Sequence, residues 1–256
     1  MTLAFPDAFS LKGHRALITG GGSGLGLAMA HCMVAAGAEV IIASRNEAKL
    51  IEACSTLGPN ASYIVHDVTD FDRTCDLPGV IAETTGPISC LVNNSGGTAK
   101  YPVDEMSLRD FQNVMDTHVT GAFALVSAFV PQLETQNSPS ILFTASMSSF
   151  LGIPNVIGYS AAKSAYVGMV RALSTELAPK SIRVNGIAPG WVDTALSRTA
   201  LSTDPERKAK VIGRIPMGRM GDTEDIGWAA AFLTSQAARY VTGQILAVDG
   251  GALHGF

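Results

Sequence analysis

Short apolar runs alternate with longer amphipathic stretches along most of the chain. The runs are rich in Val, Ile and Leu, which is typical of strands buried on both faces of a parallel sheet. They cover residues 15–19, 39–43, 63–65, 90–92, 141–144, 182–187 and 244–248. Helical spacing of apolar residues occupies 27–34, 47–55, 107–129, 159–177 and 223–233. This alternation predicts an α/β fold, a doubly wound seven-stranded parallel sheet with three α/β/α layers.

Two segments depart from this pattern. Residues 71–83 have helical spacing but contain Pro78-Gly79, which predicts a short and irregular helix. Residues 195–214 are more polar, and we expect them to form a mobile substrate lid. No linker or repeat divides the chain, and 47% of its residues are hydrophobic, which favours one dinucleotide-binding and catalytic domain over 1–256.

Charge and composition exclude several kinds of partner. The formal net charge is −4 and the pI is about 5.7, so nucleic acid is not expected to bind. Residues 1–10 lack a basic and then apolar pattern, and no uninterrupted apolar run is long enough for a bilayer, so we expect a cytoplasmic protein without membrane contact. The four cysteines are scattered, which predicts reduced thiols and no metal site.

A glycine-rich turn joins the first strand to the first helix. Glycines let a backbone approach a pyrophosphate, and the helix N-terminus supplies amide donors, as in a Rossmann-like dinucleotide site. Many turns are glycine-rich, so the position between strand and helix near the N-terminus is what makes this interpretation credible. The candidate cofactor residues here are Gly20, Gly22, Ser23, Gly24, Leu25 and Gly26.

The second strand ends in Ser44-Arg45, where an NAD-binding domain carries an acidic residue. A hydroxyl followed by a guanidinium suits the 2′-phosphate of NADP(H), because Arg pairs with phosphate and stacks on adenine. Alternatively, Arg45 only caps a surface loop. Asp67 and Val68 follow the third strand, where they would touch the adenine edge.

Tyr159 and Lys163 are four residues apart on a predicted helix and therefore share a face. A lysine charge near a phenol lowers the phenol pKa, so Tyr159 could transfer a proton at neutral pH. This spacing also arises by chance on exposed helices. Ser146 shortly before it and Asn94-Ser95-Gly96 after a central strand argue against chance, although asparagine and glycine most often simply form turns.

Together these motifs resemble the short-chain dehydrogenase/reductase family over essentially the whole chain. Its motifs appear as Thr19–Gly26, Asn93–Gly96, Ser146, Tyr159 with Lys163, and Pro189-Gly190. The resemblance implies that Ser146 hydrogen-bonds the substrate oxygen, Tyr159 transfers its proton, and Lys163 holds the nicotinamide ribose and lowers the tyrosine pKa. It also implies cofactor contacts. These involve Asn94, Ser95, Gly96, Tyr159, Lys163, Pro189, Gly190, Val192 and Thr194.

His118 is a departure from the family pattern, which usually has asparagine in the middle of the long helix. A single histidine on an apolar helix face is more often a packed core residue than a catalyst. As a candidate catalytic residue, His118 would hold a water of a proton relay or titrate itself, because its ordinary pKa is near neutrality.

The substrate is expected to be a small carbonyl compound or alcohol. Apolar residues between Ser146 and Tyr159, together with Trp191, favour a lipophilic ketone or a 3-oxoacyl group. Residues 134–138 offer no basic site for an acidic carrier protein. A polyol or sugar-acid dehydrogenase and a non-catalytic NADP-binding protein are the alternatives; the intact Ser146, Tyr159 and Lys163 disfavour the latter. The resemblance also implies a homotetramer.

Overall fold

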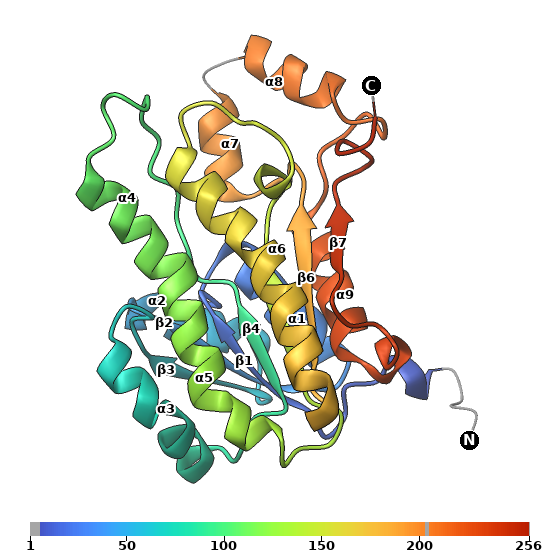
Figure 1. Cartoon of the computed structure of the whole chain (residues 1–256). Coiled ribbons are helices and arrows are strands. Elements are labelled where there is room, and N and C mark those ends of the chain that lie inside the picture. Colours follow the sequence, from blue (N-terminus) through green and yellow to red (C-terminus); the bar gives the residue numbers. More distant parts are fainter. Residues whose placement is uncertain (1–5, 203–204, 256) are drawn as a thin grey trace.

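One parallel sheet organises the computed structural model, which describes residues 6–202 and 205–255. The strand order is β3-β2-β1-β4-β5-β6-β7, and every neighbouring pair is parallel. The strands are β1 (Arg15–Thr19), β2 (Glu39–Ser44), β3 (Ala61–Val65), β4 (Cys90–Asn93), β5 (Ser140–Thr144), β6 (Arg183–Pro189) and β7 (Ile245–Val248). The predicted doubly wound fold is confirmed (Figure 1).

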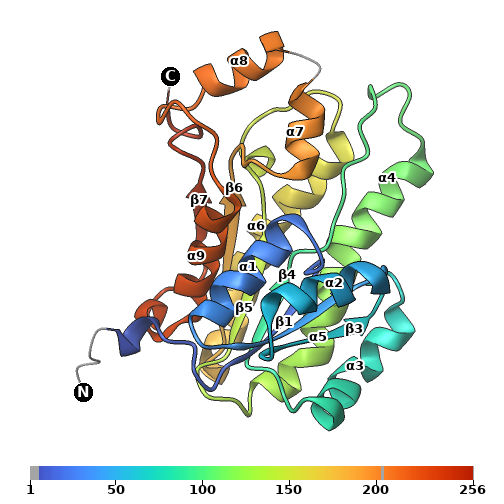
Figure 2. The same cartoon turned by 180° about the vertical axis from the view of Figure 1, so that it is seen from behind.

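Helices cover both faces of this sheet. The principal ones are α1 (Gly24–Ala35), α2 (Glu47–Leu57), α3 (Phe71–Thr84), α4 (Leu108–Met115), α5 (Gly121–Leu133), α6 (Ile157–Leu177), α7 (Ala195–Ser202), α8 (Pro205–Gly213) and α9 (Thr223–Thr234). Helices α3, α5 and α6 lie on one face (Figure 1), and α1, α2 and α9 lie on the other (Figure 2). Each face buries its own apolar cluster, because the strands present apolar side chains to both sides.

Helix α3 differs from its prediction as a short, irregular helix. It runs without interruption through fourteen residues, with Pro78 inside it. Its buried side chains Thr74, Leu77 and Ile81 face the core, and the Gln132 side-chain amide donates to the Pro78 carbonyl at 3.0 Å. Packing of the apolar face therefore outweighs the cost of the proline.

The long helix predicted over 107–129 begins at Leu108 and extends to Leu133. It contains a π-helical turn, η2 (Asp116–Thr120), between α4 and α5. By length and composition this helix is apolar enough to cross a membrane, a test that core helices also pass. Its residues Leu125, Val126 and Phe129 are buried in the core beneath the sheet, as in a core helix.

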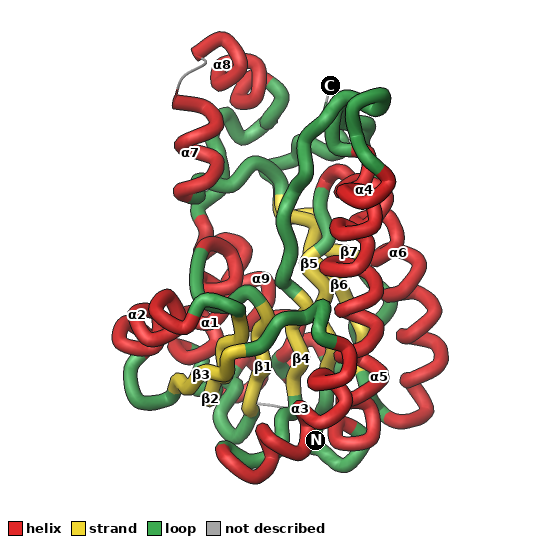
Figure 3. The backbone as a smooth tube through the Cα atoms, turned by 90° about the vertical axis from the view of Figure 1, so that its left-hand side faces the viewer, coloured by secondary structure: helices red, strands yellow, loops and turns green. Residues whose placement is uncertain are grey.

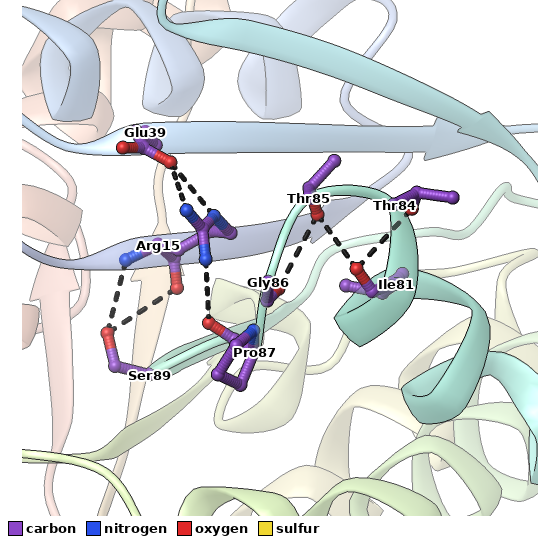
Figure 4. A network of polar contacts seen from close by, with 8 residues as sticks. All are labelled: Arg15, Glu39, Ile81, Thr84, Thr85, Gly86, Pro87 and Ser89. Atoms are coloured by element: carbon purple, nitrogen blue, oxygen red, sulfur yellow. Dashed lines mark hydrogen bonds and ion pairs between the residues drawn. The ribbon is translucent and has the colours of Figure 1, made fainter.

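The amino ends of the central strands are tied together by Arg15 (Figure 4). Its Nε donates to Glu39 at 2.9 Å, and its Nη1 donates to the Pro87 carbonyl at 3.2 Å. The Ser89 hydroxyl accepts from the Arg15 amide at 3.2 Å. This network fixes β1 against β2 and the start of β4 at the amino ends of the strands, opposite the sequence motifs that follow the strands.

The carboxyl ends of the strands carry those motifs. The strand order reverses between β1 and β4, and such a reversal opens a crevice for ligands in open α/β sheets. Helices α7 and α8 stand beyond the carboxyl ends of the strands, away from the two helical layers (Figures 1 and 3). Two residues of the predicted lid, 203 and 204, lie outside the described residues.

Candidate active site

The glycine turn after β1 adopts the backbone that its sequence requires. Gly20 has φ +67°, a left-handed conformation that favours glycine. A Cβ on Gly26 would overlap the Gly20 carbonyl, so the first turn of α1 lies directly on the loop. Ser23 is the N-cap of α1, yet its side chain makes no capping hydrogen bond. The turn therefore has the close approach and the hydroxyl that a phosphate site needs.

Asn94 joins three strand ends. Its Nδ2 donates to the Thr19 carbonyl at 3.0 Å, and its backbone amide donates to Thr19 Oγ1 at 3.0 Å. Its Oδ1 accepts from Thr144 Oγ1 at 3.2 Å. The amide group of Asn94 thus holds β1, β4 and β5 together, and it is Ser95 and Gly96 that border the adjoining cavity.

That cavity has a volume of about 520 Å³ and lies beside the reversal of strand order. Many of the residues that line it were predicted as cofactor ligands. They are Gly20, Ser23, Ser44, Arg45, Asp67, Val68, Ser95 and Gly96. Other predicted cofactor residues do not line it. They are Gly22, Gly24, Leu25, Gly26, Asn94, Tyr159, Lys163, Pro189, Gly190, Val192 and Thr194.

Sequence reasoning missed several residues of the cavity wall. Lys49 lies in the first turn of α2, which begins two residues after Arg45, so the predicted helix start could have identified it as a second cation near Arg45. Asn46 caps the same helix by accepting from the Lys49 amide at 3.0 Å. Thr98, Asn113 and other residues come from the β4–α4 connection and α4, whose approach to the cavity depends on tertiary packing. The others are Gly97, Ala99, Asp110, Val114 and Thr117, the last of them in η2 after α4, and His66 lines the cavity from the segment after β3.

The cavity wall includes the Arg45 guanidinium, which is only loosely paired with Asp67. The Arg45 guanidinium lies 3.8 Å from an Asp67 oxygen, and its side chain is 80% exposed. Partial burial would raise the pKa of Asp67, but hydrogen bonds from Thr69 and the Arg45 charge outweigh it and lower that pKa. Asp67 is therefore ionised, and Arg45 keeps enough freedom to bind an anion.

Ser146, Tyr159 and Lys163 come together where β5 ends and α6 begins. Ser146 Oγ accepts from the Ser148 amide at 3.1 Å and is hydrogen-bonded to the Tyr159 side chain. Lys163 is 3% exposed, and its Nζ donates to the Thr144 carbonyl at 2.6 Å. The same Nζ lies 5.6 Å from the centroid of the Tyr159 ring. The predicted catalytic set is thus one cluster.

The expected lowering of the tyrosine pKa is not observed in this cluster. Burial raises the pKa of Tyr159, and the hydrogen bond with Ser146 opposes that effect without reversing it. Burial also lowers the pKa of Lys163 to about 7. A lysine that is only partly charged at neutral pH stabilises a phenolate less, which explains the difference.

His118 is 1% exposed and lies in the π-helical turn η2. Its Nε2 is 2.9 Å from the Gly97 carbonyl, and its ring meets that of Tyr159 edge-on with centroids 5.6 Å apart. Burial, followed by the nearby Lys163 charge, lowers the pKa of His118 to about 3 despite the bond to Gly97. Such a low pKa does not favour the alternative in which His118 itself titrates near neutrality, and its burial agrees with a packed core residue.

The residues expected near the nicotinamide follow β6. Gly190 donates to the Val248 carbonyl at 2.9 Å, which places the Pro189-Gly190 turn against β7. Val192 is buried and forms a bridge with Gly221. The Thr194 amide donates to Ser197 Oγ at 2.8 Å at the start of α7. This segment connects the carboxyl end of β6 to α7.

The family of the chain follows from comparison with known proteins. The family model described as Enoyl-(Acyl carrier protein) reductase matches residues 20–253. The chain therefore belongs to the short-chain dehydrogenase/reductase family of oxidoreductases.

The names of similar proteins refer to different substrates. The chain is 36% identical over 252 residues to gluconate 5-dehydrogenase of Gluconobacter oxydans, covering 97% of this chain and 98% of that protein. It is 33% identical over 245 residues to the 3-oxoacyl-(acyl-carrier-protein) reductase FabG of Thermotoga maritima, with coverage of 94% and 98%.

A solved structure is also similar. It is that of a gluconate 5-dehydrogenase from Burkholderia cenocepacia in complex with NADP and tartrate. The TM-score is 0.92 and the identity 32%, with coverage of 98% of this chain and 99% of that chain.

Proposed function

We propose that this protein is an NADP(H)-dependent oxidoreductase that interconverts a ketone and a secondary alcohol. The observation that carries the proposal is the cluster of Ser146, Tyr159 and buried Lys163 at the same sheet edge as the cavity. In this cluster Ser146 binds the substrate oxygen and Tyr159 gives or takes its proton. Lys163 holds the ribose of the cofactor and fixes the cluster through its bond to Thr144.

The chemistry of the cavity fits NADP(H) as the cofactor. The Gly20 turn and the free Ser23 hydroxyl suit a pyrophosphate, whereas Ser44, Arg45 and Lys49 suit a 2′-phosphate. Asp67 beside Arg45 already accepts two hydrogen bonds from Thr69 through Oδ1, which makes it less available to a 2′-hydroxyl. NADP(H), when bound, supplies or accepts the hydride at the nicotinamide ring.

For the substrate we propose a sugar acid, which was the alternative from sequence. The names of two similar proteins support this choice, since both are gluconate 5-dehydrogenases and one was crystallised with tartrate. The proposed lid over residues 195–214 contains five basic and two acidic residues in a chain with a net charge of −4. A locally positive segment near the carboxyl ends of the strands would attract a carboxylate substrate.

A lipophilic ketone or 3-oxoacyl substrate is the second candidate. The similarity to a 3-oxoacyl-(acyl-carrier-protein) reductase favours it, as does the exposure of Phe150, Ile153 and Ile157. The other apolar residues of that segment support it less, because Met147 and Val156 are buried in the protein.

The experiment that tests the proposal is a turnover assay with NADPH and NADH on 2-keto and 5-keto sugar acids, 3-oxoacyl thioesters and aromatic ketones. Tyr159→Phe should lower kcat by about 10²–10⁴-fold, because it removes the proton donor, while NADPH binding stays within about twofold. Sugar acids should give the highest kcat/KM with NADPH. Retention of most turnover in Tyr159→Phe would exclude the proposed chemistry.

We also propose a cytoplasmic homotetramer, in keeping with the expectation from sequence. Exposed apolar side chains on the α4–α5 helix support it, with Leu108 89% and Phe123 58% exposed. Apolar residues of this size on one helix face favour association with a second copy. Residues 1–256 are proposed to act as one domain.

A further inference from the structure

His118 is attached to three parts of the molecule at once. It lies in the π-helical turn η2, and its backbone carbonyl accepts from the Tyr166 hydroxyl of α6 at 2.8 Å. Its ring contacts the loop after β4 through Gly97 and the ring of Tyr159 through an edge-on packing. His118 therefore connects the cavity wall at Gly97 to the ring of Tyr159.

The contact with the loop has a defined direction. A carbonyl oxygen can only accept, so Nε2 of His118 carries the proton and donates to the Gly97 carbonyl at 2.9 Å. Nδ1 is then an acceptor, and it has no hydrogen-bond partner among the described residues. The ring is a neutral, single-tautomer imidazole rather than a proton carrier.

The loop at Gly96–Gly97 packs tightly against the His118 ring. A Cβ on Gly96 would overlap the His118 ring, with Cε1 as the nearest atom. Gly96 and Gly97 both line the cavity that suits NADP(H), and Thr117 beside His118 lines it too. A shift of the imidazole would therefore move the cavity wall.

The His118 ring also packs against the ring of Tyr159. The His118 and Tyr159 rings are 5.6 Å apart at 79°, a favourable edge-to-face geometry. The ionisable groups around His118 are Tyr159, Tyr166 and Lys163, with Lys163 Nζ 4.7 Å from the Tyr166 centroid. The catalytic phenol is thus supported by a ring that also holds the loop.

We infer that His118 is a positioning residue that couples the cofactor-facing loop at Gly96–Gly97 to the orientation of the Tyr159 ring. The hydrogen bond from Nε2 sets the loop, and the edge of the ring sets the tyrosine. This inference rests on the proposed roles of NADP(H) and Tyr159 and adds a link between them. The low pKa of His118 agrees with a role that needs no titration.

Three variants separate the two contacts. His118→Phe keeps a ring against Tyr159 but removes the donor to Gly97. His118→Gln keeps a donor that can reach the Gly97 carbonyl but removes the ring. Gly96→Ala pushes on the ring from the loop side. His14→Gln is the matched control, because His14 is a partly buried histidine bonded to Ser89 at the opposite edge of the sheet.

The measurements are the Kd for NADPH by fluorescence titration, kcat at saturating NADPH, and the pH dependence of kcat, with folding checked by circular dichroism. His118→Phe and Gly96→Ala should weaken NADPH binding about tenfold, whereas His118→Gln should keep it within about threefold and lower kcat about tenfold. The apparent pKa values of the kcat profile should stay in place. His14→Gln should match the wild type in all three.

Two results would overturn the inference. If folded His118→Phe bound NADPH with wild-type affinity, the hydrogen bond to Gly97 would not set the loop. If an apparent pKa of the kcat profile moved in His118→Gln, His118 would have a titrating role. Failure of the proposed function is distinguishable, because Tyr159→Phe would then retain turnover while the NADPH titrations of the His118 variants still report on the loop.

Discussion

At the scale of single residues, burial governs the electrostatics of the catalytic cluster. The Lys163 ammonium has one backbone acceptor, the Thr144 carbonyl, and two aromatic rings as its environment. Desolvation therefore outweighs these contacts and lowers its pKa to about 7. The same burial raises the pKa of Tyr159, so both groups are held nearer to their neutral forms.

This balance predicts a pH dependence of stability. Between about pH 7 and 10.5, unfolded Lys163 binds a proton that folded Lys163 does not, so the free energy of unfolding rises with pH. Lys163→Met should reduce the rise between pH 7 and 9 by roughly 1–2 kcal/mol. Urea unfolding at both pH values measures this. Lys180→Met, at an exposed ion pair with Glu134, should keep the wild-type rise, and an equal rise in Lys163→Met would contradict the prediction.

Arg45 carries a second prediction at this scale, on cofactor preference. Arg45→Ser should weaken NADPH binding about 10–100-fold, since charge-assisted hydrogen bonds contribute about 1.5–3 kcal/mol. Binding of NADH should change by less than about twofold, because it lacks the 2′-phosphate. Fluorescence titration with both cofactors checks this. Arg239→Ser, an exposed arginine outside the cavity, is the charge-matched control, and equal losses for NADPH and NADH would refute a phosphate contact.

At the residue scale, the features that depend on spacing along the chain could be predicted from the sequence. The four-residue interval between Tyr159 and Lys163 defines a shared helix face, and the glycines after β1 indicate the turn directly. The contact of His118 with Gly97 and the inclusion of Thr98 in the cavity depend on how the β4–α4 connection folds over the sheet. Sequence spacing contains no information on such contacts.

At the scale of elements, tertiary packing overrides local signals. Helix α3 passes through Pro78 because packing of its buried face outweighs the backbone hydrogen bond that the proline cannot donate. The π-helical turn η2 was not predicted either, since its apolar positions fit ordinary helical spacing. In contrast, the strands followed from their apolar runs: β1 has the predicted bounds, and the other strands differ from prediction by only a residue or two at their ends.

Helix α9 shows the same dependence on a distant residue. Buried Arg183 at the start of β6 donates to the carbonyls of Leu233, Thr234 and Ser235, the last of these at 3.4 Å. The Leu233 and Thr234 carbonyls end α9, whereas Ser235 also accepts from the Ala238 amide at 3.2 Å, so the guanidinium satisfies the end of the helix and offsets its dipole.

Arg183→Met should therefore destabilise the protein by about 3 kcal/mol, because it leaves buried carbonyls without donors. Thermal unfolding should show a clear fall in Tm, with little change in Kd for NADPH. Arg171→Met removes an exposed arginine from α6 and should leave Tm within a degree or two. A wild-type Tm in Arg183→Met would show that water or another group replaces the guanidinium.

At the scale of the whole molecule, both faces of the sheet are covered, but the helices keep some apolar side chains on their outer sides. Ile51 of α2 and Trp228 of α9 are about half exposed, and the α4–α5 helix leaves Phe123 and the nearly fully exposed Leu108 on its outer side. A large apolar side chain that faces water favours a partner surface, and a second copy offers the same helix.

Phe123→Glu should for this reason shift the protein from tetramer towards smaller species. Sedimentation velocity at micromolar concentration should give a wild-type mass near four times the 26.7 kDa chain, and a mass of one or two chains for the variant. Burying two like charges at each two-fold contact costs more than the lost apolar area. Ile51→Glu, on α2 with similar exposure, should remain tetrameric. A monomeric wild type would contradict the tetramer itself, and a tetrameric Phe123→Glu would place the interface elsewhere.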